Sequence, residues 1–161
     1  MRVAVACDHA GFPLKDAVLA AVLEAGHEVI DLGTFSDEPV DYPDYAVKVG
    51  NAIRSGEAER GVLLCGSGVG ASIAASKMDG IYSAVCHDSY SAHQGVEHDD
   101  MNVLSLGARI IGPAMVRELV TTFLAARFLG NDPGQERHKR RVGKVRMIEA
   151  GESINDEGLD E

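Results

Sequence analysis

Long apolar stretches are absent from this 161-residue sequence, whereas a bilayer-spanning helix needs about 20 consecutive apolar residues. The N-terminal stretch MRVAVACDHAG has one Arg and a short apolar run that ends at Asp8, which predicts a first β-strand rather than a secretory leader. Internal repeats, low-complexity segments and linkers are also missing before residue 151. We therefore expect one domain over residues 1–150 and no membrane partner.

Positive charge is scarce as well, because 15 Lys and Arg stand against 25 Asp and Glu and leave a formal net charge of −10. A chain this acidic is not expected to bind nucleic acid or an anionic membrane. Residues 151–161, GESINDEGLDE, contain five acids and no Lys or Arg. We expect this segment to be an acidic, disordered tail.

Cysteine is sparse, and its residues are not closely spaced in pairs. The three residues, Cys7, Cys65 and Cys86, include no C-x-x-C motif. An odd number of cysteines without such a motif predicts reduced thiols in a cytoplasmic protein. Hydrophobic residues make up 45% of the chain, which is enough for one buried core.

What is present is a regular alternation of short β-rich runs and longer amphipathic runs. The expected strands are 3–7, 28–32, 61–65, 81–86 and 102–106, and the expected helices are 14–24, 44–54, 70–77, 89–96, 113–128 and 135–149. This order predicts an α/β fold: a three-layer, doubly wound, mostly parallel five-stranded sheet (Rossmann-like) with a C-terminal helix. Ligands of such sheets bind outside the carboxyl ends of the strands, where the CDH, CGSGVG and CHD stretches fall.

The glycine-rich stretch GVLLCGSGVGAS allows three interpretations. Gly66-x-Gly68-x-x-Ala71 fits the dinucleotide fingerprint, and Asp88 lies about 20 residues further on, but this loop follows the third strand of a short chain. Alternatively, Cys65 is a base at a helix N-terminus, and the glycine N–H groups form an oxyanion hole for an enolate. Taken alone, Cys65 is best explained as a small buried hydrophobic residue.

The stretch HDSYSAHQGVEHDDMN is rich in His and Asp and raises the question of a metal site. His93 and His98 are five residues apart and do not share a helix face, so we expect no metal and favour a general acid or base. The Asp8–His9 pair at the end of the first strand fits a turn, a helix cap or an acid–base couple, of which the cap is favoured by itself.

Basic residues cluster in RHKRRVGKVR, residues 137–146, which contains six Lys and Arg and no acid. Arg137 and Arg141 are four residues apart and share one helix face, and Arg109 follows the last strand at the carboxyl edge. Guanidinium groups match the geometry of a phosphate. The cluster is either a sugar-phosphate site or, as we slightly favour without further evidence, a solvated helix face.

Together, five motifs extend this picture over residues 1 to about 149: CDHAGFPLK, DYPDYA, CGSGVGASIAASK, EHDDMNVLSLGARIIG and RHKRRV. In this order they resemble the B-type ribose-5-phosphate isomerases and their relatives, the allose- and galactose-6-phosphate isomerases. The resemblance implies an aldose–ketose isomerase that interconverts ribose 5-phosphate and ribulose 5-phosphate through a cis-enediolate.

The resemblance also implies a role for each matching residue. Cys65 is the base, Ser67 lies beside it, and His98 opens the sugar ring with help from Asp8. The remaining matches are the N–H groups of Gly66, Ser67, Gly68, Val69 and Gly70 for the enediolate, and His9, Arg109, Arg137 and Arg141 for the sugar and its phosphate.

Two further implications concern partners and substrate. The family forms homodimers or homotetramers with shared sites, so His98 and the arginines would serve a neighbour's Cys65, with no metal or organic cofactor. Asp99 stands where the family commonly has Asn, and an ionised Asp only accepts hydrogen bonds. The preferred sugar phosphate is therefore open to allose, galactose or tetrulose phosphate. A nucleotide-binding module and a non-catalytic paralogue are the remaining alternatives.

Overall fold

The computed structural model describes residues 1–154, so most of the segment expected to be a disordered tail lies outside the described residues. Within this range the elements, in chain order, are β1 (Arg2–Cys7), α1 (Phe12–Glu24), β2 (Glu28–Asp31), α2 (Tyr42–Arg54), β3 (Arg60–Cys65), α3 (Val69–Ala75), β4 (Ser83–Val85), α4 (Ser89–Asp99), β5 (Val103–Gly107), α5 (Pro113–Ala125) and α6 (Glu136–Glu149). None of the helices in residues 1–154 is long and apolar enough to cross a membrane.

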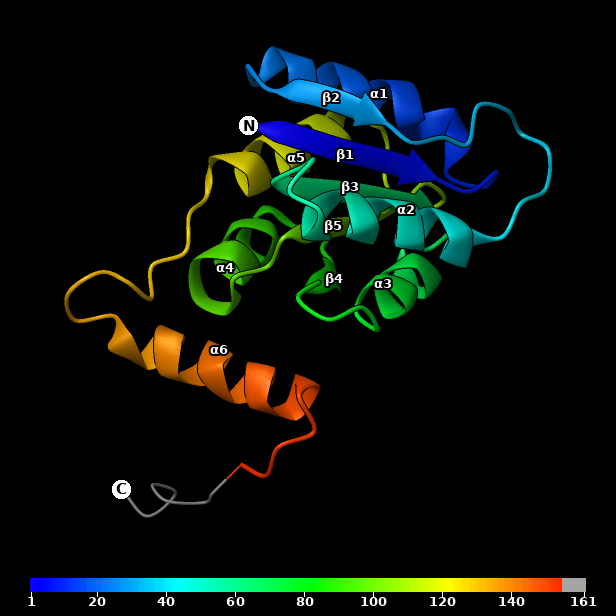
Figure 1. Ribbon diagram of the computed structural model, residues 1–161. Helices are drawn as coiled ribbons and strands as arrows, with labels where there is room; N and C mark the ends of the chain where they lie inside the picture. The colour runs from blue at the N-terminus through cyan, green and yellow to red at the C-terminus, as the bar shows by residue number, and fades with distance from the viewer. Residues whose placement is uncertain (155–161) are drawn as a thin grey trace.

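The strands form one sheet in the order β2-β1-β3-β5-β4, and every pairing between them is parallel. Helices α1 and α5 lie on one side of this sheet and α2 and α3 on the other (Figure 1). The structure confirms the predicted three-layer α/β fold. Since all strands are parallel, their carboxyl ends share one edge of the sheet.

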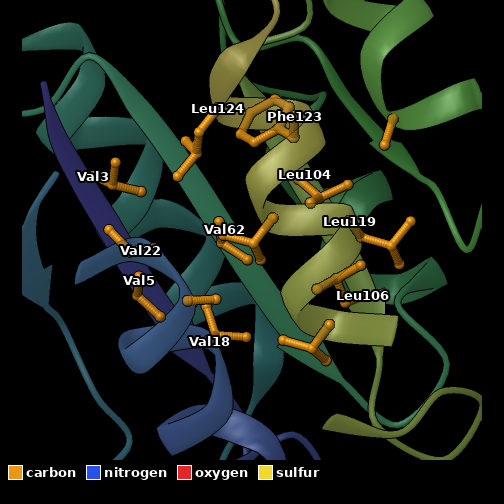
Figure 2. Close-up of a cluster of buried hydrophobic side chains, with 14 of the residues drawn as sticks. Val3, Val5, Val18, Val22, Val62, Leu104, Leu106, Leu119, Phe123 and Leu124 are labelled. Carbon is orange, nitrogen blue, oxygen red and sulfur yellow. The ribbon is translucent and has the colours of Figure 1, made fainter. Parts of the chain in front are cut away.

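The core has two halves because successive strand residues point to opposite faces. Val3, Val5 and Val62 face the half covered by α1, α4 and α5, where Phe123 is fully buried (Figure 2). The other half lies under α2 and α3 and uses smaller residues. Its strand residues are Ala4, Ala6, Leu63, Cys65 and Val103. This alternation places the Cys65 side chain on the α2–α3 face.

Two elements are three residues shorter than the sequence predicts. Helix α5 ends at Ala125 rather than near Phe128, because the Arg60 guanidinium donates hydrogen bonds to the carbonyls of Phe123 and Ala126. These carbonyls would otherwise accept from a further helical turn. Strand β4 keeps three residues of the predicted 81–86, since it is an edge strand that pairs only with β5.

Helix α6 lies outside the three layers and packs on α4 (Figure 1). Its last turns are fixed by polar contacts with the body. Arg146 donates to Asp100 at 2.9 Å, and Glu149 accepts the Gly80 N–H at 2.7 Å. The basic helix is therefore held at a defined place on the surface.

Gly11, just before α1, allows that helix to approach β3. A Cβ atom at Gly11 would lie 2.6 Å from the Leu64 carbonyl oxygen. We expect Gly11→Ala to lower the free energy of unfolding by about 1–3 kcal/mol in chemical denaturation, because backbone must shift to admit the methyl group. Gly143→Ala in α6 is the matched control, since no neighbouring atom lies within 4 Å and stability should be unchanged or higher. Equal losses in the two variants would contradict this account.

Candidate active site

A cavity of about 430 Å³ opens at the carboxyl edge of the sheet. Its walls come from the ends of β1, β3 and β5 and from the starts of α2 and α3. The lining residues are Asp8, His9, Ala10, Tyr42, Cys65, Gly66, Ser67, Gly70, Arg109 and Ile110. Seven of the residues predicted for the site thus share one cavity: Asp8, His9, Cys65, Gly66, Ser67, Gly70 and Arg109.

The Cys65 thiol lies against the glycine loop, and the residue is 5% exposed. The Gly68 N–H donates to Cys65 Sγ at 3.1 Å. Gly68 has φ of +84°, a left-handed conformation that a side chain would strain, and it directly precedes α3. An N–H directed at sulfur stabilises negative charge there. The loop therefore fixes the sulfur at the start of α3, in the wall of the cavity.

The glycine loop is fixed to the end of β5 by its backbone. Ala108 donates to the Cys65 carbonyl at 2.9 Å, and Arg109 donates to the Gly66 carbonyl at 3.0 Å. Gly107 permits this contact, since a Cβ there would lie 2.6 Å from the Ser67 carbonyl oxygen. The loop that surrounds the thiol is consequently held from two strands.

Asp8 and His9 take different roles at the end of β1. Asp8 Oδ1 accepts the Gly11 N–H at 2.8 Å, which agrees with the turn interpretation from the sequence, and the residue is 6% exposed. The cap interpretation is wrong, because the N-cap of α1 is Gly11 and no side chain caps this helix. His9 Nδ1 lies 3.2 Å from the Val40 backbone nitrogen, in the loop before α2. Both side chains are thus oriented by backbone groups while they line the cavity.

Arg109 and Tyr42 complete the wall. A Cβ at Gly66 would lie 3.6 Å from the Arg109 guanidinium carbon, and one at Gly70 would lie 2.8 Å from the Tyr42 ring. Gly70 therefore provides space for the Tyr42 ring, whereas a Cβ at Gly66 would make only an ordinary van der Waals contact with Arg109. Tyr42 was not among the predicted site residues, although the DYPDYA motif contains it.

Five predicted residues lie elsewhere. Val69 at the start of α3 is half exposed and does not line the cavity, and the other four belong to α4 and α6: His98, Asp99, Arg137 and Arg141. Helix α4 leads back to the amino end of β5, and Val103 there pairs with Gly61, four residues before Cys65. Since the strands are parallel, the end of α4 lies at the opposite edge of the sheet from the thiol.

His98 and the basic helix nevertheless meet. The ring of His98 stacks on that of His138 with centroids 4.0 Å apart, and Arg137 Nε donates to His138 Nε2 at 3.2 Å. Burial, followed by the charges of His98, Arg137 and Arg141, lowers the pKa of His138. One chain therefore carries two separate groups of predicted site residues, one at each edge of its sheet.

His138 is a second residue that sequence reasoning missed. It is 1% exposed, although it lies within the most basic segment of the chain. A fully buried imidazole beside two arginines distinguishes the start of α6 from a solvated helix face. The histidine within RHKRR was the available signal, but a motif of surface charges gives no indication of burial.

The three histidines of the His-rich segment each have a different hydrogen-bond or ion-pair partner. His93 pairs with Glu97 at 3.0 Å, His98 with Gln94 at 2.8 Å, and His87 Nε2 accepts the Gly107 N–H at 2.9 Å. Within residues 1–154, no group of three or more His, Cys, Asp or Glu side chains is arranged to hold a metal ion.

The three thiols differ in environment, which gives a chemical test of the site. Burial raises the pKa of both Cys7 and Cys86 to about 11, so at pH 8 only about one part in a thousand of each is thiolate. Cys65 lines the cavity and accepts an N–H. We expect iodoacetamide at pH 8 to alkylate Cys65 first, as read by mass spectrometry of native protein quenched at intervals. Equal labelling of all three would contradict the assigned environments.

Comparison with known proteins places this arrangement in a family. The family described as Ribose/Galactose Isomerase matches residues 3–145. Ribose-5-phosphate isomerase B of Escherichia coli is 44% identical over 92% of this chain and 96% of its own, and a D-erythrulose-4-phosphate isomerase of Pectobacterium atrosepticum is 37% identical over 81% and 86%. The solved structure of Clostridium thermocellum ribose-5-phosphate isomerase B is 44% identical, with a TM-score of 0.88 over 94% of this chain and 99% of that chain. The chain belongs to the ribose/galactose isomerase family.

Proposed function

We propose that this protein is an aldose–ketose isomerase that interconverts ribose 5-phosphate and ribulose 5-phosphate. The observation that carries the proposal is the Cys65 sulfur, which accepts the Gly68 N–H in a cavity also lined by Asp8, His9 and Arg109. The similarity to ribose-5-phosphate isomerase B supports the choice of substrate.

The proposed reaction moves one proton between two carbons and one proton between the oxygens that these carbons carry. The Cys65 thiolate removes the proton from carbon 2 of the open-chain aldose, and the electrons of that bond form a cis-enediolate with its negative charge on oxygen. The N–H groups of the Gly66–Gly70 loop, apart from that of Gly68, which is directed at the sulfur, stabilise this charge, with the Ser67 hydroxyl beside them. A proton then passes from the carbon 2 hydroxyl to the oxygen on carbon 1, so that the negative charge moves to the oxygen on carbon 2. The Cys65 thiol returns its proton to carbon 1, the carbonyl forms at carbon 2, and the thiolate is regenerated.

A complete site requires two copies of the chain in this proposal. His98, assisted by Asp8, opens the sugar ring, whereas Arg137 and Arg141 bind the phosphate together with His9 and Arg109. His98 lies at the opposite sheet edge from Cys65, so it serves the Cys65 of a neighbouring subunit. The proposed assembly is a homodimer or homotetramer.

The identity of the sugar depends on Asp99. A carboxylate there accepts hydrogen bonds from sugar hydroxyls and repels a nearby phosphate unless an arginine pairs with it. Ribose 5-phosphate is the first candidate. A tetrulose phosphate is the second, because Asp99 departs from the family pattern and one relative is a D-erythrulose-4-phosphate isomerase.

A nucleotide-binding module is a weaker alternative for the same loop. The Gly68 N–H points at a sulfur of its own chain rather than being free for a pyrophosphate. All three cysteines are free thiols, which supports the proposed cytoplasmic location. A role in pentose phosphate metabolism is part of the proposal and follows from the proposed substrate, ribose 5-phosphate.

The reaction can be followed by proton NMR in D₂O with ribose 5-phosphate and no added metal. We expect ribulose 5-phosphate that carries solvent deuterium, and Cys65→Ala should lower kcat by about a hundredfold or more, because a positioned base contributes roughly 10²–10⁴. Cys86→Ala is the matched control, since this thiol lies in the core away from the cavity, and it should keep activity within a few-fold. Cys65→Ala activity within a few-fold of wild type would remove Cys65 from the role of base.

Subunit sharing has its own test. Cys65→Ala and Arg137→Ala damage different parts of a shared site, so a 1:1 mixture dissociated and reassembled as dimers should regain intact sites at about one quarter of the total. Each variant alone should stay impaired, and reassembled wild type gives the reference rate. Activity of the mixture equal to the mean of the two variants would show that each chain holds a complete site.

A further inference from the structure

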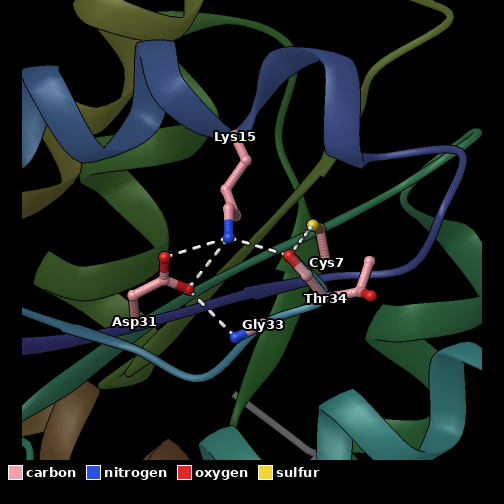
Figure 3. A network of polar contacts seen from close by, with 5 residues as sticks. All are labelled: Cys7, Lys15, Asp31, Gly33 and Thr34. Carbon is pink, nitrogen blue, oxygen red and sulfur yellow. Dashed lines mark hydrogen bonds and ion pairs between the residues drawn. The ribbon is translucent and has the colours of Figure 1, made fainter. Parts of the chain in front are cut away.

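Lys15 on α1 is a buried cation that the proposed reaction does not use. The residue is 3% exposed, and its ammonium group donates to Asp31 Oδ2 at 2.9 Å, to Asp31 Oδ1 at 3.2 Å and to the Thr34 carbonyl at 2.8 Å (Figure 3). The three N–H groups of the ammonium therefore have three acceptor oxygens. Burial of such a charge is costly unless it is fully paired, and an unneeded pair is often replaced by apolar residues without loss of stability.

The acceptors of Lys15 belong to the segment that leaves β2. Asp31 Oδ1 also accepts the Gly33 N–H at 3.0 Å, and Thr34 N–H donates to the Cys7 carbonyl at 2.8 Å. The Phe35 ring lies over the ammonium group at 4.4 Å and separates it from solvent. Lys15 thus fixes the first residues of the loop between β2 and α2 against the end of β1.

The far end of that loop reaches the cavity. The Val40 N–H donates a hydrogen bond to His9 Nδ1 at 3.2 Å. Tyr42, where α2 begins, packs against Gly70 in the cavity wall. The loop has no helix or strand of its own between Asp31 and Tyr42. The path of the loop is therefore determined by the contacts at its two ends, and Lys15 holds the end that follows Asp31.

We propose that Lys15 is a positioning residue for the isomerase site: it anchors loop 33–41 through Asp31 and Thr34, so that Val40 and Tyr42 hold His9 and the cavity wall ready for the sugar phosphate. Lys15 does not line the cavity and does not touch the substrate. This inference rests on the proposed function for its kinetic consequence, but its structural consequence can be measured without substrate.

The variant that tests it is Lys15→Met/Asp31→Asn, which removes both charges, retains an acceptor for Gly33 N–H and leaves no unpaired buried charge. We expect faster hydrogen exchange at the Val40 amide, and a KM for ribose 5-phosphate raised about tenfold with kcat within about threefold, as loss of one well-oriented hydrogen bond to a charged group would give. Addition of His9→Ala should raise KM by less than the product of the separate effects, because Lys15 acts through His9.

Arg117→Met/Glu24→Gln is the matched control. This pair joins α5 to the last residue of α1 at 3.0 Å on the exposed surface, and its removal should leave KM and Val40 exchange unchanged. Phe35→Ala is a milder second variant that admits water to the ion pair, and it should produce smaller changes in the same direction. It keeps the test valid even if the double variant does not fold.

The outcomes separate the two hypotheses. Unchanged Val40 exchange in the folded variants would overturn the anchor. Faster exchange with unchanged KM, or effects that multiply with His9→Ala, would overturn the positioning role and leave Lys15 a purely structural residue. Absence of isomerase activity in the wild type would contradict the proposed function alone, while the exchange data would still decide whether Lys15 anchors the loop.

Discussion

The close approach of the glycine loop to the end of β5 is the contact on which the site depends. It fixes the Cys65 carbonyl through Ala108, and it directs the Gly68 N–H at the sulfur. It also requires a residue without a side chain at Gly107, where any Cβ would collide with the loop backbone. A thiol at a strand end is common, but a thiol with an N–H aimed at it needs both neighbouring backbones in place. The packing of β3 beside β5 thus determines the chemistry of Cys65.

The sequence predicted the fold well because each strand ends in a recognisable change of composition. The runs before Cys7 and Cys65 are apolar and the following residues are polar or Gly, and this change locates the carboxyl edge from the sequence alone. Boundaries were less accurate where tertiary contacts set them. Helix α5 stops at Ala125 because Arg60, some sixty residues earlier in the chain, occupies its last carbonyls. No local pattern reveals such a contact.

The candidate site likewise contains residues that the sequence could place and residues that it could not. Residues that follow strands, such as Asp8 and Arg109, could be placed at one edge from the parallel topology alone. His138 could not, because its burial depends on how α6 docks on α4, which is a matter of two helix surfaces rather than of periodicity. Lys15 was overlooked for a similar reason, since a lysine on an amphipathic helix is ordinarily exposed and its partner Asp31 lies on another element.

The alternation of side chains along the strands has a chemical consequence for oxidation. Cys7 and Cys86 belong to the core half under α1, α4 and α5, whereas Cys65 points to the other face of the sheet. A sulfenic acid formed on Cys65 by peroxide would therefore have no resolving thiol on its own face of the sheet. Its repair would depend on small thiols that diffuse into the cavity, and otherwise oxidation would proceed to the irreversible acids. The arrangement that separates this thiol from Cys7 and Cys86 thus leaves it without internal protection from oxidants.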